Sequence, residues 1–248
     1  MIVPISIGRL RSVKLTGQTA IVTGAGKGLG AAIARVLADE GVRLALCGRR
    51  LAPLETLVAE LGPQHLALTC DVLDENQVEH TVGRVAEEFG QLDILVNNAG
   101  VAGWIPFEET TTEYFDTVIA TNLRGSFLFC RHAWRHLKAS KGQILNVSSI
   151  AGSNGYGKMT AYCASKWGLN GFSEALSVEG SAHGIRVMTL GPGAVDTDIW
   201  GDAATSEERE RMMTPDQVAG LAVWLLTSPR NIQVKKTIIE NFESPFEG

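Results

Sequence analysis

A tyrosine followed by a lysine four residues later is the strongest chemical feature of the sequence. Of three tyrosines, only Tyr162 has such a partner, Lys166. On a helix this spacing brings both side chains to one face. A phenol with a pKa near ~10 must lose about three units, or ~4 kcal/mol, to exchange protons well at neutral pH. We therefore expect the Lys166 ammonium to lower the pKa of Tyr162 and make it a general acid and base.

A glycine-rich loop near the N-terminus predicts a site for a pyrophosphate group. An expected strand runs directly into TGAGKGLG at 23–30, and a helical pattern follows. Glycines let the backbone approach phosphate closely, and a helix N-terminus supplies free N–H groups and a favourable dipole. Tight turns also collect glycine, but the strand–turn–helix setting favours binding. The candidate contacts are Thr23, Gly24, Lys27, Gly28, Leu29 and Gly30.

The second expected strand ends in basic residues, which bears on the choice of cofactor. An acid at this point binds the ribose hydroxyls of NAD, whereas a base accommodates the 2′-phosphate of NADP. Here the chain reads Gly48-Arg49-Arg50, and Lys27 adds a cation from the glycine loop. The sequence therefore favours NADP(H). Arg50 could equally cap or solvate the next helix, so Arg49 is the residue assigned to the phosphate.

Four motifs in order resemble those of the classical short-chain dehydrogenase/reductase family. They are TGAGKGLG at 23–30, NNAG at 97–100, YCASK at 162–166 and PGAVDT at 192–197, and Ser149 lies thirteen residues before Tyr162. The resemblance covers about residues 15–230. It implies an oxidoreductase that interconverts a carbonyl compound and an alcohol with a nicotinamide cofactor.

The resemblance also implies a catalytic tetrad. Tyr162 is expected as general acid and base, Lys166 as the group that lowers its pKa and holds the nicotinamide ribose, and Ser149 as the donor that steadies the substrate oxygen. Asn122 is expected to link Lys166 to a proton relay through backbone and water. Ser148 competes with Ser149, but strand alternation points the two in opposite directions. Either serine could instead merely close the strand with a local bond.

Further cofactor contacts follow from the resemblance alone. Asp71 could equally be a turn residue or a helix cap. The contacts implied are Asp71 and Val72 beside the adenine, Asn98, Ala99 and Gly100 along the adenosine side, Tyr162 and Lys166, and Pro192, Gly193, Val195 and Thr197 near the nicotinamide.

Short β-branched runs alternate with helical periodicity, which is typical of βαβ units around a parallel sheet. We predict an N-terminal extension at 1–14 and one doubly wound α/β (Rossmann) domain at 15–248, with seven parallel strands and helices on both faces. The strands are expected at 19–23, 43–47, 65–69, 94–97, 143–148, 186–190 and 234–239, and helices near 28–40, 50–61, 78–89, 111–138, 161–182 and 215–227. Thr214 and Pro215 should open the last helix.

Composition excludes several classes of function. The net charge of −5 with scattered basic residues argues against a nucleic-acid binder. No apolar run approaches the roughly 18 residues that cross a bilayer, so we expect a cytoplasmic protein without a membrane partner. The residues at 1–14 are basic without acids, which faintly resembles a transit peptide, although an ordinary extension is favoured. The four cysteines are too far apart for a metal motif, and no metal is expected.

Three irregular segments, 102–110, 150–159 and 196–213, should border the substrate at the carboxyl edge of the sheet. Their mainly apolar side chains favour a 3-oxoacyl thioester or a hydrophobic ketone over a heavily hydroxylated sugar. The stretch 206–211 is expected to form a helical, mobile cover. The expected wall comprises Trp104, Ile105, Phe107, Asn154, Tyr156, Met159, Ala194, Ile199 and Trp200, several of which could instead pack the cover itself.

The C-terminus departs from the commonest pattern of the family. After Ser228-Pro229-Arg230 the chain reads NIQVKKTIIENFESPFEG instead of a glycine turn, a strand and a glycine-rich end. This weakens an assignment to fatty-acid synthesis and puts subunit packing through that edge in doubt. By resemblance we expect a homodimer or homotetramer that meets through helices 111–138 and 161–182.

An alternative class is a non-catalytic NADP(H)-binding sensor or scaffold on the same fold. The presence of both Tyr162 and Lys166 weighs against it. A lyase or epimerase that uses the cofactor transiently is a smaller possibility.

Overall fold

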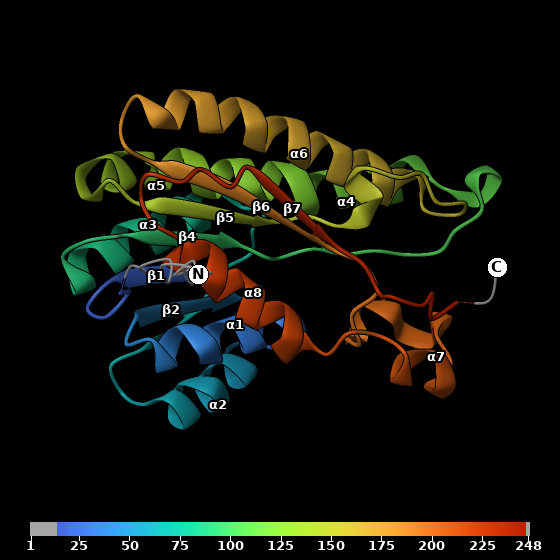
Figure 1. Ribbon diagram of the computed structural model, residues 1–248, viewed down its shortest axis with the longest axis horizontal. Helices are drawn as coiled ribbons and strands as arrows, with labels where there is room; N and C mark the ends of the chain where they lie inside the picture. The colour runs from blue at the N-terminus through green and yellow to red at the C-terminus, as the bar shows by residue number, and fades with distance from the viewer. Residues whose placement is uncertain (1–13, 247–248) are drawn as a thin grey trace, which may run out of the picture.

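Short apolar strands assemble into a parallel sheet in the computed structural model, which describes residues 14–246 (Figure 1). The strand order is β3-β2-β1-β4-β5-β6-β7, and every neighbouring pair is parallel. Each expected strand is confirmed, with ends that differ by at most two residues. The strands are β1 (Thr19–Thr23), β2 (Arg43–Gly48), β3 (Leu66–Thr69), β4 (Ile94–Asn97), β5 (Gln143–Val147), β6 (Arg186–Pro192) and β7 (Lys236–Ile239).

Helices cover both faces of the sheet, as the fold class requires (Figure 1). On one face lie α1 (Gly28–Asp39), α2 (Leu51–Leu61) and α8 (Pro215–Thr227). The other face carries α3 (Glu75–Phe89), α4 (Thr112–Ile119), α5 (Gly125–Ser140) and α6 (Thr160–Ser181), while the short α7 (Ser206–Glu210) lies apart at one end of the sheet. The predicted doubly wound architecture is therefore confirmed. The predicted extension at 1–14 lies almost wholly outside the described residues.

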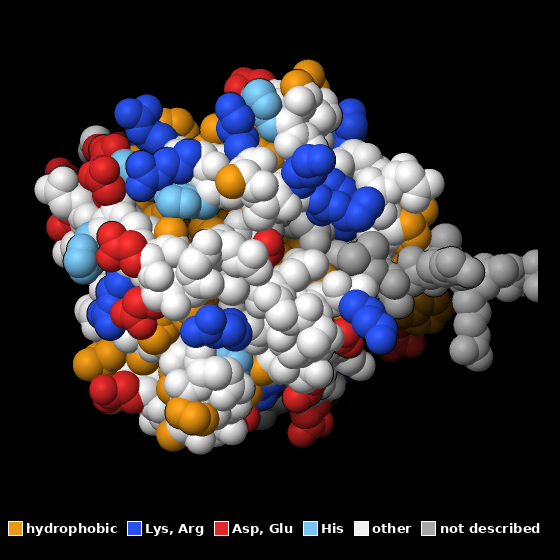
Figure 2. Space-filling model, turned by 90° about the vertical axis from the view of Figure 1, so that its left-hand side faces the viewer, with side chains coloured by type: hydrophobic (Ala, Val, Ile, Leu, Met, Phe, Trp, Pro, Cys, Tyr) orange, Lys and Arg blue, Asp and Glu red, His pale blue; other side chains and the backbone are white. Residues whose placement is uncertain are grey.

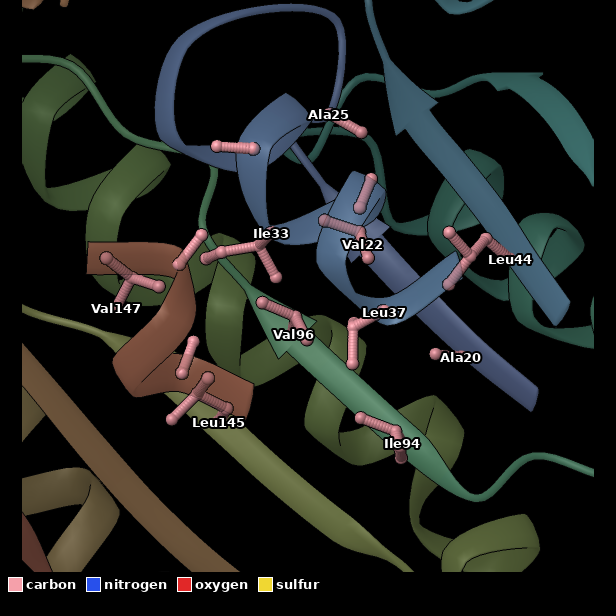
Figure 3. Packing of buried hydrophobic residues seen from close by; sticks show 14 of the residues in the cluster. Ala20, Val22, Ala25, Ile33, Leu37, Leu44, Ile94, Val96, Leu145 and Val147 are labelled. Atoms are coloured by element: carbon pink, nitrogen blue, oxygen red, sulfur yellow. The ribbon is translucent and has the colours of Figure 1, made fainter. Parts of the chain in front are cut away.

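The core between α1 and the sheet fixes where the glycine loop lies. Ile33 and Leu37 of α1 are fully buried, and Figure 3 shows them directed toward Ile94 and Val96 of β4. Because α1 is held flat on the strands, its N-terminus must lie at the carboxyl end of β1.

Two helix starts show how local sequence sets the elements. Asp74 caps α3 by accepting hydrogen bonds from Asn76 N and Gln77 N. Thr214 and Pro215 open α8 as predicted, because Thr214 forms a capping box with Gln217.

The sheet order reverses direction between β1 and β4. From β1 the chain builds outward through β2 and β3, then returns to pair β4 with the other side of β1. A crevice forms outside the carboxyl ends of the strands at such a switch point, and ligands bind there in open α/β sheets. The loops after β1, β4, β5 and β6 are therefore the ones that can build a site.

The outer surface carries mixed charge. On the side turned away from α7, Lys and Arg side chains are interspersed with Asp and Glu (Figure 2). Within residues 14–246, no helix is long and apolar enough to span a bilayer. The cytoplasmic location remains a prediction.

Candidate active site

Tyr162 and Lys166 lie on one face of α6 and are both buried. Their side chains are 9% and 4% exposed. The Lys166 ammonium lies 5.6 Å from the centroid of the Tyr162 ring and donates to Val147 O at 2.8 Å. The predicted pairing across one helical turn is thus present, and the end of β5 holds the lysine in place.

The structure contradicts the expected fall in the pKa of Tyr162. Burial raises the pKa of this phenol to about 12, and the neighbouring Ser149 hydroxyl lowers it only in part. Burial also lowers the pKa of Lys166 to about 8. Desolvation is the largest cause of both shifts, because both groups lose water when they are packed against the sheet.

Ser149 and Ser148 face different neighbours, as strand alternation requires. The Ser149 hydroxyl accepts from Ala151 N at 3.1 Å and donates to Pro192 O at 3.4 Å. The Ser148 hydroxyl donates to Lys166 O at 3.5 Å, at the backbone of α6. Ser149 is therefore the serine that neighbours the Tyr162 hydroxyl. It also makes a local hydrogen bond with Ala151, which is the alternative role that we considered from the sequence.

Asn122 interrupts the long helix predicted at 111–138. A π-helical turn, Ala120–Arg124, separates α4 from α5, and the Asn122 side chain is 1% exposed within it. Its amide nitrogen donates to Val101 O and to the Ser165 hydroxyl, each at 2.9 Å, and its oxygen accepts from Val101 N at 2.8 Å. Such π-turns occur frequently at functional sites. The Asn122 side chain thus ties the loop after β4 to α6. Its expected link from Lys166 to a proton relay stays a prediction.

The glycine loop after β1 is interlocked with the loop after β4. The Thr23 hydroxyl accepts from Asn98 N and Ala99 N, each at 3.0 Å, and Asn98 Nδ2 donates to Thr23 O at 2.9 Å. A Cβ at Gly30 would lie 2.3 Å from Gly24 O, so no other residue fits this backbone approach. Sequence reasoning placed these residues at the site but missed that Thr23 and Asn98 hold its two loops together.

The N-terminus of α1 fits a phosphate group. Lys27 occupies the N-cap position in an extended conformation, and no side chain among the described residues caps the helix there. Gly24 and Gly28 adopt φ angles of +65° and +55°, which favour glycine and shape the turn. A loop with free N–H groups at a helix N-terminus is the chemistry that a dinucleotide pyrophosphate requires.

The three basic residues that we predicted to bind phosphate differ in their surroundings. Arg49 and Arg50 are exposed after β2. Lys27 instead pairs with Asp198 at 2.8 Å, and this contact holds the pKa of Asp198 below its usual value. Asp198 was missed from the sequence because 171 residues separate the two, and no local signal links them.

The remaining predicted contacts line the same edge of the sheet. Asp71 accepts from Leu73 N at 3.0 Å, which is the turn role left open by the sequence. A Cβ at Gly100 would lie 3.8 Å from Lys166 Nζ, and one at Gly28 would lie 3.3 Å from Thr197 Cγ2. Of the predicted segment Pro192, Gly193, Val195 and Thr197, Thr197 lies beside the glycine loop, while Val72 packs beside Gly125.

Comparison with known proteins decides the family. The model of the family described as short chain dehydrogenase matches residues 18–208. This protein belongs to the short-chain dehydrogenase/reductase family. It is therefore an oxidoreductase of a family that acts on alcohols and ketones with a nicotinamide cofactor.

Relatives of this short-chain dehydrogenase carry varied names. It is 40% identical to the D-threitol dehydrogenase of Mycolicibacterium smegmatis, over 86% of each chain. It is 38% identical to the 3-oxoacyl-[acyl-carrier-protein] reductase of Bos taurus, over 84% of this chain and 90% of the relative. Among solved structures, an alcohol dehydrogenase from Thermococcus sibiricus complexed with 5-hydroxy-NADP matches with a TM-score of 0.84 and 30% identity, over 91% and 97% of the two chains.

In this short-chain dehydrogenase the segment 196–213, which we call the lid, lies at the carboxyl edge. Its predicted helical stretch is confirmed as α7, where Thr205 and Glu208 form a capping box. Arg209 fastens the lid through Asp196 at 2.9 Å and Gly201 O at 2.7 Å. Its mobility stays a prediction.

The expected substrate wall is only partly assembled. Trp104 and Trp200 stack with their ring centroids 4.7 Å apart, and Met159 is buried beside Tyr162. Phe107, in contrast, is 75% exposed. Asn154, Tyr156 and Ile199 are exposed as well, whereas Ala194 is buried and Ile105 is half-buried.

Substitution of Gly30 by alanine tests the interlocked loops. The added methyl group would overlap Gly24 O, and overpacking of this kind costs ~1–3 kcal/mol, or about 5- to 100-fold in binding if the loop absorbs it. We expect NADPH fluorescence titration to show weaker binding. Gly220→Ala on α8 is the control, since no described atom lies within 4 Å of its added Cβ. Equal affinities in the two variants would contradict this account of the loop.

Proposed function

We propose that this protein is an NADP(H)-dependent oxidoreductase that interconverts a ketone and a secondary alcohol, with Tyr162 as general acid and base. One observation carries the proposal: Tyr162 is buried beside Lys166 and Ser149, at the edge of the sheet where the glycine loop lies. The residues of that loop would hold the pyrophosphate, and the segment 192–197 would border the nicotinamide.

A bound nicotinamide supplies or accepts the hydride in this chemistry. The protein must align the substrate and move one proton at the substrate oxygen. Since burial raises the pKa of Tyr162 to about 12, the phenol carries its proton at neutral pH. In the reductive direction Tyr162 would give this proton to the substrate oxygen, and Ser149 would donate a hydrogen bond as negative charge develops there.

The substrate class follows from the wall beside Tyr162. Trp104 and Met159 pack next to the tyrosine, and Trp200 stacks on Trp104, so apolar side chains border Tyr162. This supports a hydrophobic ketone or a 3-oxoacyl thioester, and one relative is named as an oxoacyl reductase. Other relatives are named as D-threitol dehydrogenase and galactitol 2-dehydrogenase. Polyols therefore belong in the substrate panel beside the ketones.

A preference for NADP(H) is supported by charge. The loop after β2 presents the exposed side chains of Arg49 and Arg50, and Lys27, which pairs with Asp198, lies in the glycine loop. A base at this point suits a 2′-phosphate. The solved alcohol dehydrogenase of Thermococcus sibiricus is complexed with an NADP derivative.

Replacement of Tyr162 by phenylalanine should abolish turnover while NADPH binding persists. The variant loses the proton donor, which typically contributes ~100- to 10,000-fold in rate. Activity is followed by nicotinamide absorbance with a panel of ketones and polyols. Tyr114→Phe is the matched control, because the Tyr114 hydroxyl has no hydrogen-bond partner within residues 14–246. Retained turnover in the Tyr162 variant would remove its assigned role. NADPH binding without any turnover in the wild type would favour the sensor or scaffold.

Replacement of Arg49 by alanine should weaken NADPH binding and leave NADH binding unchanged. Loss of one charged hydrogen bond to phosphate costs ~1.5–3 kcal/mol, so the Kd for NADPH should rise roughly 10-fold or more. Arg50→Ala, measured in parallel, separates the two neighbouring arginines. Equal weakening of both cofactors would show that Arg49 does not read the 2′-phosphate.

We also propose that the protein is a homodimer or homotetramer whose subunits contact one another through α4, α5 and α6. Three large apolar side chains on α5 and α6 are exposed: Phe127 by 42%, Trp167 by 54% and Val178 by 67%. Large apolar side chains exposed on the same two helices support an interface there.

Light scattering tests the assembly through two tryptophans on opposite faces of the sheet. Trp167→Glu on α6 should lower the particle mass, because a carboxylate would be buried at the interface. Trp224 on α8 is 49% exposed. Trp224→Glu should leave the particle mass unchanged, because the proposed interface does not include α8 or the edge of the sheet at β7. A fall in mass only for the Trp224 variant would reverse this assignment.

A further inference from the structure

The chain beyond β7 folds back onto the lid. In Figure 1 it runs to the same end of the molecule as α7. We call residues 240–246 the C-terminal strap. At its start, Gly193 N donates to Ile239 O at 2.7 Å. Asn241 then accepts from Ala194 N at 3.0 Å and donates to Arg211 O at 3.2 Å. One side chain of the strap therefore joins the chain just before the lid to the chain near the end of the lid.

An aromatic stack continues from the strap to the candidate active site. The ring of Phe246 lies 4.9 Å from that of Trp200, and Trp200 stacks on Trp104 at 4.7 Å. Trp104 packs against the buried cluster that contains Met159 and Tyr162. A continuous line of contacts thus connects the last described residues of the chain to the proposed proton donor.

Trp200 contributes an apolar ring face to the stack and no free hydrogen-bond donor. The indole N–H of Trp200 donates to Val195 O at 2.8 Å, so its only donor is already used. Aromatic faces in contact with one another contribute beyond their buried area. The two phenylalanines of the strap differ in burial. Phe246 is half-buried against Trp200, whereas Phe242 is fully exposed.

We propose that Phe246 is a positioning residue that sets substrate specificity by holding Trp200 against Trp104. The strap then closes the outer side of the pocket with apolar rings. The substrate that fits is a ketone or alcohol with an apolar or ring-shaped portion beyond its reacting carbon. The substrate half of this inference rests on the proposed oxidoreductase function. Its structural half, that Phe246 holds the lid through Trp200, can be measured without turnover.

Hydrogen exchange of the lid tests the structural half. Phe246→Ala should speed exchange of the amides at 198–212 by about 2- to 10-fold, the range expected for loss of one aromatic pair. Phe242→Ala is the matched control: it removes the same side chain from the same strap without removing a packed ring. Phe246→Tyr should restore protection. Equal exchange in the two alanine variants would overturn the proposal.

Kinetics test the substrate half. We expect Phe246→Ala to raise the KM for a cyclic ketone such as cyclohexanone more than the KM for acetone, while the Kd for NADPH stays that of the wild type. A merely structural role would change both KM values equally, and that result would overturn the assignment. If the lid loosens as expected but the wild type reduces no carbonyl compound and oxidises no alcohol, the proposed function fails together with the substrate half of this inference.

Discussion

The burial of a phenol and an ammonium on one turn of α6 is the constraint on which the rest of the site depends. Desolvation disfavours the charged form of both groups, raising the pKa of Tyr162 to about 12 and lowering that of Lys166 to about 8. The neighbouring chain offsets part of this cost. Val147 O accepts from Lys166, and Ser149 lowers the pKa of the phenol. In the candidate active site, burial thus disfavours the charged forms of both groups, and the neighbouring chain offsets only part of that cost.

The parallel sheet gathers the parts that this pair requires. Since every strand points the same way, the loops after β1, β4, β5 and β6 all emerge at one edge. Thr23 and Asn98 bind two of these loops together, and Asn122 binds the second to α6. The glycine turn, the loop after β4 and α6 therefore form one hydrogen-bonded unit.

The proposed substrate specificity depends on more distant parts of the chain. The lid leaves the sheet after β6 and the strap follows β7, and Asn241 of the strap bonds both to Ala194, just before the lid, and to Arg211, near the end of the lid. The C-terminal strap supplies Phe246 to the aromatic stack.

The sequence by itself determined the strands, the start of α8 at Thr214 and the shared face of Tyr162 and Lys166, because each depends on residues within a few positions of one another. It also placed the glycine loop, whose spacing encodes a local turn. It did not determine the direction of the Tyr162 pKa shift, the pairing of Lys27 with Asp198 or the contact of Phe246 with Trp200. Burial and long-range contacts arise only when distant segments pack, and a linear pattern carries no direct measure of either.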